Sequence, residues 1–291
     1  MCSGSCLHRA EFSSHLASVL QKSQNTLPEE CPDVLLYTST LPLPSVEFSK
    51  PQKAQLRQHA VSIWNSCNLV STADDPLDHG GISKLRAFAY LLLASIAPPT
   101  STKSRNIPKL FENSLAAIRE CLQAGDLELA GKLLELEADM IPLLEEDNGS
   151  RADDQEYVSC AISYFCLRLL HYWKQNRRDL ADRHYSHLLN TPHHLEESDV
   201  EMVVDLLFEI GKECLSQQDA GNATVWLERA MHILDAHSTG DNFAGSDLRL
   251  NLLHCLGKFP LVLGTPLTYK LQSKHYQPFP AKSVLHERIA C

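Results

Sequence analysis

The chain has 291 residues, of which 44% are hydrophobic, so it is long enough to bury the core of one or two domains. Glycine is sparse, with 12 residues, and aromatic residues make up only 7% of the chain, a composition that favours helices. There are 26 Lys and Arg residues against 36 Asp and Glu residues, which gives a formal net charge of −10. This balance argues against direct binding to nucleic-acid phosphates, because such binding needs clustered cations.

Residues 1–50 are rich in serine and proline and are predicted to form a poorly ordered leader. The start of the chain lacks the uninterrupted apolar core of a secretory signal peptide. The longest apolar run, FAYLLLASIA at residues 88–97, is about half as long as a membrane-spanning helix. We therefore expect no interaction with a membrane.

From residue 51 to 258, hydrophobic residues recur at three- and four-residue steps, the periodicity of helices that bury one face. Prolines, glycines and capping residues divide this region into helices and short connections. The expected helices cover residues 51–70, 82–97, 108–122, 127–144, 156–173 and 180–189, then one that opens at residue 198, one that ends near residue 236, and residues 246–257.

Three residues are predicted to cap these helices. Asp126 is a plausible N-cap for the helix that begins at residue 127. Ser198, with Glu201 three residues later, has the spacing of a capping box. Either Asp219 or Gly221 opens the helix that follows the turn at residues 217–222.

The most distinctive stretch is VDLLFEIGKECLSQQDAGNATVWLERA at residues 204–230. It contains two amphipathic helical patterns joined by a short polar turn. Small residues at Gly211, Ala223 and Ala230 are 12 and 7 positions apart, the register of a tetratricopeptide (TPR) hairpin, a unit of roughly 34 residues. Small side chains are expected there because the first helix (A) of a unit lies close against the second (B).

Two further turns have similar chemistry, AGDLELA and NRRDLA, and their anchor alanines are Ala130 and Ala181. The spacings 181 − 130 = 51 and 223 − 181 = 42 exceed the standard repeat, which indicates divergent units with longer loops. The sequence therefore predicts an all-α fold, a right-handed αα-solenoid of divergent TPR-like hairpins. The predicted repeat-packing positions are Trp64, Ala130, Phe165, Ala181, Leu207, Gly211, Ala223, Trp226, Leu227 and Ala230.

Nothing in the chain predicts a catalytic residue, a cofactor site or a small-molecule substrate. The GxSxG turn of serine hydrolases and the Gly-rich phosphate loop are both missing from the sequence. His184, His187, His193 and His194 are close in sequence, but their spacing matches no common zinc site, so we expect a solvated helix face and loop and no metal. The pair at residues 177–178 (RR) is either an ordinary turn or a small contact patch for an acidic partner.

Six cysteines fall within helical patterns, where cysteine behaves as a small buried hydrophobic residue, and none forms a CxxC pair. We interpret them as reduced thiols of an intracellular protein.

Several segments, in this order, resemble one protein family, and together they cover about residues 50–255. They are LRQHAVSIWNSCNLV (56–70), KLRAFAYLLLASIA (84–97), AGDLELAGKLLE (124–135), YFCLRLLHYWKQNRRDLADRHYS (164–186) and DLLFEIGKECLSQQDAGNATVWLERAMHILD (205–235). They resemble the N-terminal portion of the meiosis-specific TPR proteins of the Zip-four or Spo-twenty-two (sporulation-specific) family, which has a testis-expressed mammalian relative.

The resemblance implies a non-enzymatic scaffold in the nucleus, on meiotic chromosomes. Members of the family link crossover-promoting factors to the chromosome axis and support assembly of the synaptonemal complex. The implied partners are therefore meiotic crossover and chromosome-axis proteins, in recombination and synapsis. The family has no catalytic residues to carry over, so matching residues such as Trp64 and Gly211 would be packing positions.

Two other interpretations remain open from the sequence. A generic TPR adaptor for chaperone tails would need a basic, asparagine-rich clamp, and helix A of the best unit has only Lys212 for it. The second of these alternatives is a helical metal-dependent hydrolase. Residues 259–291 contain four prolines and no helical period, so we expect an irregular tail, a truncated or misjoined segment, that leaves the family pattern near Lys258.

Overall fold

A computed structural model describes residues 49–71, 79–96, 107–141, 155–189, 195–237 and 246–257, together with residues 38, 41 and 42. Within these ranges the chain is helical and contains no strand, which confirms the all-α prediction. The helices are α3 (Lys50–Ser71), α4 (His79–Ile96), α5 (Ile107–Gln123), α6 (Leu127–Ala138), α8 (Gln155–Lys174), α9 (Arg178–Leu189), α10 (Glu197–Ser216), α11 (Ala220–His237) and α12 (Ser246–Gly257).

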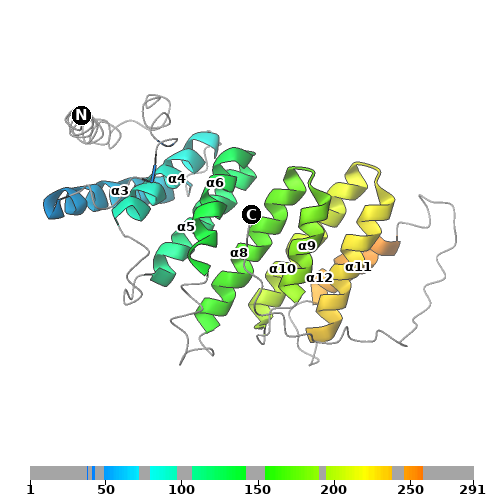
Figure 1. Ribbon diagram of the computed structural model, residues 1–291. Helices are drawn as coiled ribbons and strands as arrows, with labels where there is room; N and C mark the ends of the chain where they lie inside the picture. Colours follow the sequence, from blue (N-terminus) through cyan, green and yellow to red (C-terminus); the bar gives the residue numbers. More distant parts are fainter. Residues whose placement is uncertain are drawn as a thin grey trace.

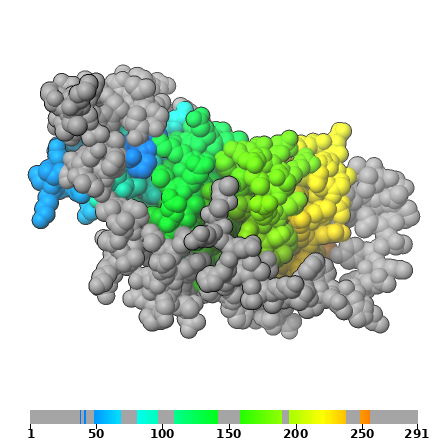
Figure 2. Space-filling view, in the orientation of Figure 1, coloured from blue at the N-terminus to red at the C-terminus, as the bar shows by residue number. Residues whose placement is uncertain are grey.

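The helices pack as consecutive hairpins in a row (Figure 1). Four pairs form the hairpins: α3 with α4, α5 with α6, α8 with α9, and α10 with α11. Helix A of each later hairpin contacts helix A of the next, so that α5, α8, α10 and α12 form one layer. Colours succeed one another along the body without returning (Figure 2), the order expected of a solenoid in which each unit contacts its neighbours. Its right-handed sense stays a prediction.

The turns of α5–α6, α8–α9 and α10–α11, called the first, second and third hairpins from here on, share one backbone conformation. Each has a residue in the left-handed region: Gly125 (φ 79°), Asn176 (φ 59°) and Gln218 (φ 62°). The next residue donates its N–H to the carbonyl five positions earlier, which closes the C-terminus of helix A as in a Schellman motif. These bonds are Asp126 to Cys121, Arg177 to Tyr172 and Asp219 to Cys214, each 2.9 Å long.

The anchor alanines follow these turns at one fixed distance. Ala130, Ala181 and Ala223 each lie four residues after the residue that closes the turn, and each donates its N–H back to the carbonyl of that residue at 3.0–3.1 Å. All three are fully buried. Helices A and B of the third hairpin also approach closely at Gly211, where an added Cβ would lie 2.6 Å from Cδ2 of Leu227.

Two hydrophobic cores meet at α8. Its residues Cys160, Tyr164 and Leu167 belong to the first core, with α3 to α6. Other α8 residues, including Ile162 and Leu169, belong to the second core, with α9 to α12. The half-buried Phe165 packs against both cores. This sharing explains why apolar residues surround α8 rather than following a single stripe.

Two helix boundaries differ from the sequence prediction by three residues or more. Helix α4 begins at His79, three residues before the predicted start. Helix α6 ends at Ala138 rather than at residue 144, and the N–H of Met140 turns to the carbonyl of Glu137 at 2.9 Å. Proline at position 142 has no N–H, and its ring would clash with the carbonyl of residue 138 in a continuous helix, so α6 cannot continue through it.

The predicted capping box at Ser198 is wrong. Helix α10 begins at Glu197, its N-cap is Glu196, and no side chain caps it. Asp199 is buried in the first turn and accepts a hydrogen bond from Ser159 of α8 at 2.5 Å. This tertiary contact places Ser198 inside the helix, where it cannot serve as the cap.

The two other capping predictions are confirmed. The side chain of Asp126 accepts from Leu129 N–H at 3.1 Å. Asp219, rather than Gly221, caps α11, because its Oδ1 accepts from Asn222 N–H at 3.2 Å.

Most of the predicted leader and the predicted tail lie outside the described residues. Thr38 and Leu41 are described, and both are buried. Leu41 belongs to the first core, and the carbonyl of Thr38 accepts from Nζ of Lys132 at 2.9 Å. Part of the predicted leader therefore packs against the solenoid.

A substitution at Ala223 tests how tightly helix B packs in the third hairpin. Leucine at this fully buried position should push α11 away from its neighbours and lower the free energy of unfolding by roughly 1–3 kcal/mol, the usual cost of overpacking. Val225→Leu is the matched control, because Val225 lies on the same helix with 42% exposure. Equal melting temperatures for the two variants would mean that Ala223 is not a close-packed position.

Candidate protein-binding groove

A groove of about 1100 Å³ lies over three A helices, α5, α8 and α10. Its apolar part comes from α8 and α10 and includes Leu167, Leu170, Met202, Leu206 and Ile210. Leu170, Met202 and Leu206 are only half-buried, although they pack between the helices. The groove therefore presents partly exposed apolar surface, which favours binding of another apolar surface.

Helices α8 and α10 run in the same direction, with residue n of α8 beside residue n + 40 of α10. Near their N-termini, Ser159 contacts Asp199, and near their C-termini Trp173 Nε1 donates to Glu213 Oε2 at 2.9 Å. This register places matching ends of the two helices at the same end of the groove.

A row of carboxylates follows α10 along the groove. Glu201, Asp205, Glu209 and Glu213 are four residues apart, so they lie one above another on a single helix face. Glu213 accepts from the indole of Trp173, as given above. Glu209 accepts from Lys212 Nζ at 2.7 Å. The other two carboxylates, at positions 201 and 205, make no hydrogen bond or ion pair within the described part of the chain.

Asp205 has the most perturbed pKa in this row. Burial raises the pKa of Asp205, and the neighbouring charge of Glu209 raises it further. Both effects disfavour the charged form of the carboxylate, so a cation placed beside it would relieve them.

Two cations lie toward the opposite end of the groove. Arg119 is near the C-terminus of α5, and Lys174 is the last residue of α8. Both are exposed, and neither is ion-paired within the described ranges. Lys174 is level with residue 214 of α10, whereas Asp205 is level with residue 165 of α8. Among the described residues, the charges of the groove that have no partner are therefore acidic along the first half of α10 and basic beside the turns, where Glu209 is paired with Lys212 and Glu213 is hydrogen-bonded to Trp173.

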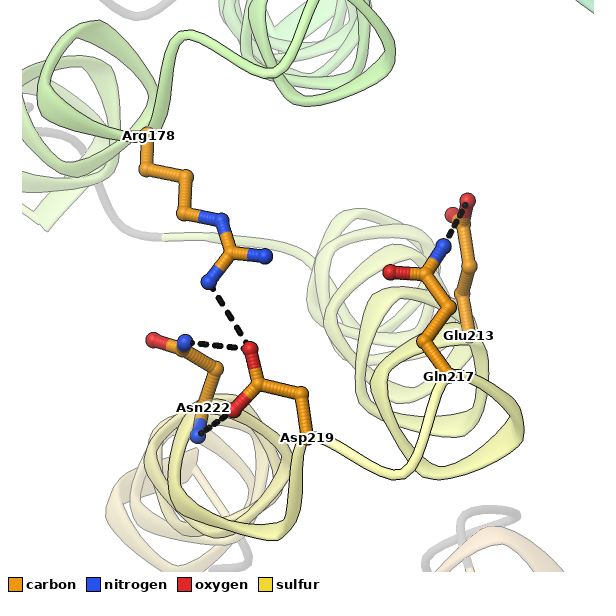
Figure 3. Close-up of polar contacts among 5 residues, drawn as sticks. All are labelled: Arg178, Glu213, Gln217, Asp219 and Asn222. Carbon is orange, nitrogen blue, oxygen red and sulfur yellow. Dashed lines mark hydrogen bonds and ion pairs between the residues drawn. The ribbon is translucent and has the colours of Figure 1, made fainter.

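An ion pair between hairpins joins the start of α9 to the start of α11. Arg178, the first residue of α9, reaches Asp219 of the following hairpin at 2.8 Å (Figure 3). Asp219 also accepts from the side chain of Asn222 at 2.7 Å. Hydrogen bonding by Asn222, and then by Arg178, lowers the pKa of Asp219. The arginine turn is thus committed to this chain, because Arg177 also lies 5.7 Å from the ring centre of Tyr172.

Aromatic contacts in the second core also join these two hairpins. The rings of Trp173 and Tyr185 both meet the Trp226 ring edge-on, with centroids 5.6 and 6.0 Å away. Arg229 lies 4.4 Å from the Trp226 ring centre and pairs with Asp182 at 2.6 Å. These contacts join the second and third hairpins, so the groove between α8 and α10 has fixed walls.

None of the repeat-packing positions predicted from the sequence lines the groove. Trp64 is half-buried, with the guanidinium of Arg86 5.5 Å from its ring centre, and Ala130 is in the first core. Phe165 lies between the cores. The second core contains Ala181, Leu207, Ala223, Trp226, Leu227 and Ala230, and Gly211 is buried beside Leu227.

Sequence reasoning missed the residues that line the groove. The acidic row could have been found, because its carboxylates recur every fourth residue within one helical pattern. Arg119 and Lys174 could not have been assigned to the same surface, because they come from different hairpins.

The predicted histidine cluster shows no metal geometry. His184 stacks on Tyr172 with ring centroids 5.1 Å apart, and burial lowers the pKa of His184 to about 4. The His187 ring centroid lies 5.9 Å away, and residues 193 and 194 lie outside the described ranges. Among the described residues, no group of three His, Cys, Asp or Glu side chains could hold a metal ion.

The cysteines of the helical patterns are free thiols, and all but the half-buried Cys255 are buried. Burial raises the pKa of Cys166 beside the groove to about 12, so this thiol stays protonated and is a poor nucleophile. None of the helices whose residues are described has the length and apolarity needed to cross a membrane.

One buried carboxyl group has the perturbed pKa that often marks a functional site. Glu137 of α6 accepts a hydrogen bond from the Tyr90 hydroxyl and is fully buried. Burial raises the pKa of Glu137 to about 7, although hydrogen bonds from Tyr90 and Ser114 oppose the shift. Glu137 lines neither the groove nor a smaller cavity of about 390 Å³ between α6 and α8. Its position is that of a core residue.

Comparison with protein families gives one match. Residues 171–270, about a third of the chain, match the family model described as Meiosis protein SPO22/ZIP4 like. This is the family that the sequence resembles, and the match implies a role connected with meiosis. It begins within α8 and extends past Lys258. No curated protein and no solved structure matches the chain.

The raised pKa of Glu137 predicts a pH-dependent stability. Because the folded chain holds this proton up to about pH 7 and the unfolded chain releases it near 4.5, stability should fall as pH rises through that window. The full loss is roughly 3 kcal/mol, at about 1.4 kcal/mol per pKa unit. Glu137→Gln keeps an acceptor for Tyr90 and removes the titration, so its stability relative to the unmodified chain should rise by roughly 2.5 kcal/mol between pH 5 and pH 8, since part of the loss has already occurred at pH 5.

Urea unfolding at several pH values measures this difference. The comparison with Glu137→Gln is needed because burial lowers the pKa of His171 and His184, which makes stability rise with pH over part of the same range. Glu135→Gln, an exposed change on the same helix, is the matched control. A Glu137→Gln difference that stays constant with pH would contradict the assignment.

Proposed function

From the family match over residues 171–270 and the groove on the A helices, we propose that this protein is a non-enzymatic scaffold of meiosis. It links crossover-promoting factors to the chromosome axis and to the synaptonemal complex, and so acts in meiotic recombination and synapsis. Its place of action is the nucleus, on meiotic chromosomes. Its partners are proteins, and it needs neither a cofactor nor a small-molecule substrate.

The groove over α5, α8 and α10 is the observation that supports a scaffold most directly. It is open, it has an apolar floor, and its long axis follows helix α10, so it is shaped for a segment of another protein. A 20-residue helix such as α10 is about 30 Å long, which is enough to bind several turns of a partner helix. A few apolar anchors such as Leu206 would supply most of the affinity.

The charges of the groove disfavour a generic adaptor for acidic chaperone tails. Such an adaptor holds a terminal carboxylate in a basic, asparagine-rich clamp, but Lys212 is paired with Glu209, and the described lining of the groove contains no asparagine. The carboxylates at positions 201 and 205 would repel an acidic tail. A metal-dependent hydrolase has less support, because the histidines that suggested it are stacked on Tyr172 or lie outside the described ranges.

Disruption of the gene tests the proposed function. We expect fewer crossovers and defective synapsis in meiotic cells, with normal growth of other cells. A tagged chain should form foci on chromosome spreads in meiotic prophase. Normal crossover numbers in the mutant, together with a tagged protein that stays off the chromosomes, would contradict the proposal.

Direct DNA binding is not expected, even for a protein on chromosomes. The net charge is −10, and Arg178 of the only adjacent arginine pair is committed to Asp219. Each phosphate contact needs a cation that is free to reach the backbone. Purified protein should therefore fail to shift duplex DNA in gels at about 150 mM salt. A sub-micromolar shift that weakens with salt would overturn this expectation.

A further inference from the structure

The groove contains charges that this chain leaves uncompensated, and they differ between its two halves. Glu201 and Asp205 lie along the first half of α10, and Arg119 and Lys174 lie beside the turns. None of the four makes an ion pair within the described part of the chain. The other charged residues of the groove have partners: Glu209 pairs with Lys212, and Glu213 accepts a hydrogen bond from the indole of Trp173.

The separation of these charges matches the dimensions of a helix. Because residue n of α8 lies beside residue n + 40 of α10, Lys174 lies beside residue 214 of α10. Asp205 comes nine residues before that position, which corresponds to about 14 Å along the helix axis. Glu201 and Asp205 are one turn apart. Two cations on one face of a bound helix, separated by four residues, would lie beside these two carboxylates.

The floor between the charges is apolar and accessible. Leu170, Met202 and Leu206 are half-buried, and their exposed parts face the groove. A helix with one apolar stripe would cover them, as in other complexes in which a helix binds between two parallel helices. The charged rows on either side would then select the partner, because like charges brought together cost several kcal/mol.

From this arrangement we infer that the groove binds an amphipathic helix of a partner protein, with Lys or Arg four residues apart in one half and Asp or Glu in the other. The basic half lies against Glu201 and Asp205, and the acidic half lies against Lys174 and Arg119. The apolar stripe between them packs on Leu206 and its neighbours. The inference rests on the proposed function only in taking the groove as a protein-binding surface, and it adds the chemistry and the orientation of the partner.

Selection of binders from a library of random 16-residue peptides, displayed against the purified full-length chain, tests this inference. We expect enriched peptides with apolar residues at helical spacing and with Lys or Arg four residues apart in one half. No enrichment, or enrichment of peptides without this charge pattern, would overturn it.

Charge reversal then locates the site. Asp205→Lys should weaken binding of an enriched peptide by at least roughly tenfold in fluorescence anisotropy, which is about 1.4 kcal/mol. Glu228→Lys makes the same charge change on the exposed face of α11, outside the groove, and should change the Kd less than about twofold. Replacing the two peptide cations with Glu should restore binding to Asp205→Lys. Equal effects of the two reversals, in chains with equal melting temperatures, would place the peptide elsewhere.

Carbodiimide crosslinking of the full-length chain alone separates the other possible occupants. Coupling of Asp205 or Glu201 to lysines of residues 259–291 within one chain would mean that the tail fills the groove. Coupling between two chains would mean that a second copy does. Either result would overturn the inference, whereas no such crosslink agrees with it. If the chain forms foci on meiotic chromosomes but Asp205→Lys has no effect, the proposed function stands and this inference fails.

Discussion

The whole solenoid depends on the close approach of helices A and B within each hairpin. This approach is set at two points that are five residues apart: a turn residue in the left-handed conformation, and an anchor alanine. The turn reverses the chain within three residues, and the alanine has no side chain beyond Cβ to hold the helices apart. Because Ala130, Ala181 and Ala223 are fully buried, all three hairpins close in the same way despite their different spacing along the chain.

The turns meet this requirement with different residues. Glycine at position 125 adopts a positive φ at little cost, and asparagine at position 176 is the next most tolerant residue. Gln218 is less suited to this conformation, so its turn depends more on the contacts around it. Asp219, directly after it, both caps α11 and pairs with Arg178 of the preceding hairpin. The turn with the least favourable residue is thus the one that a neighbouring unit supports.

Because α8 contributes residues to both hydrophobic cores, it links the two halves of the solenoid. A helix that buries two faces cannot move relative to one neighbour without disturbing the other, because both cores are close-packed. The Trp173–Trp226 contact and the Arg178–Asp219 pair add polar and aromatic contacts on the side of the turns. The helices that form the groove are therefore held in one arrangement, which sets where its charged side chains start from the backbone. A fixed surface suits a scaffold, since little ordering is needed when a partner binds.

The sequence by itself determined the all-α class, the position of most helices and the register of the hairpins. These features depend on local periodicity, turn residues and small residues at fixed spacing, and all of these can be read along one helix pair. The resemblance to a meiosis family was also contained in such packing positions, including Gly211 and Trp226. The helices between residues 107 and 237 were predicted to within three residues at nearly every end.

Only the tertiary structure decided the start of α10, the role of Arg178 and the composition of the groove. Asp199 is buried against Ser159 of α8, and this contact, rather than a capping box, sets the first turn of α10. Arg178 could equally have been a surface patch until Asp219 was found 2.8 Å away. The acidic row follows one helix, but Lys174 and Arg119 join it from two other hairpins. Such surfaces depend on how units stack, and the stacking of units with irregular spacing is not encoded in any local pattern.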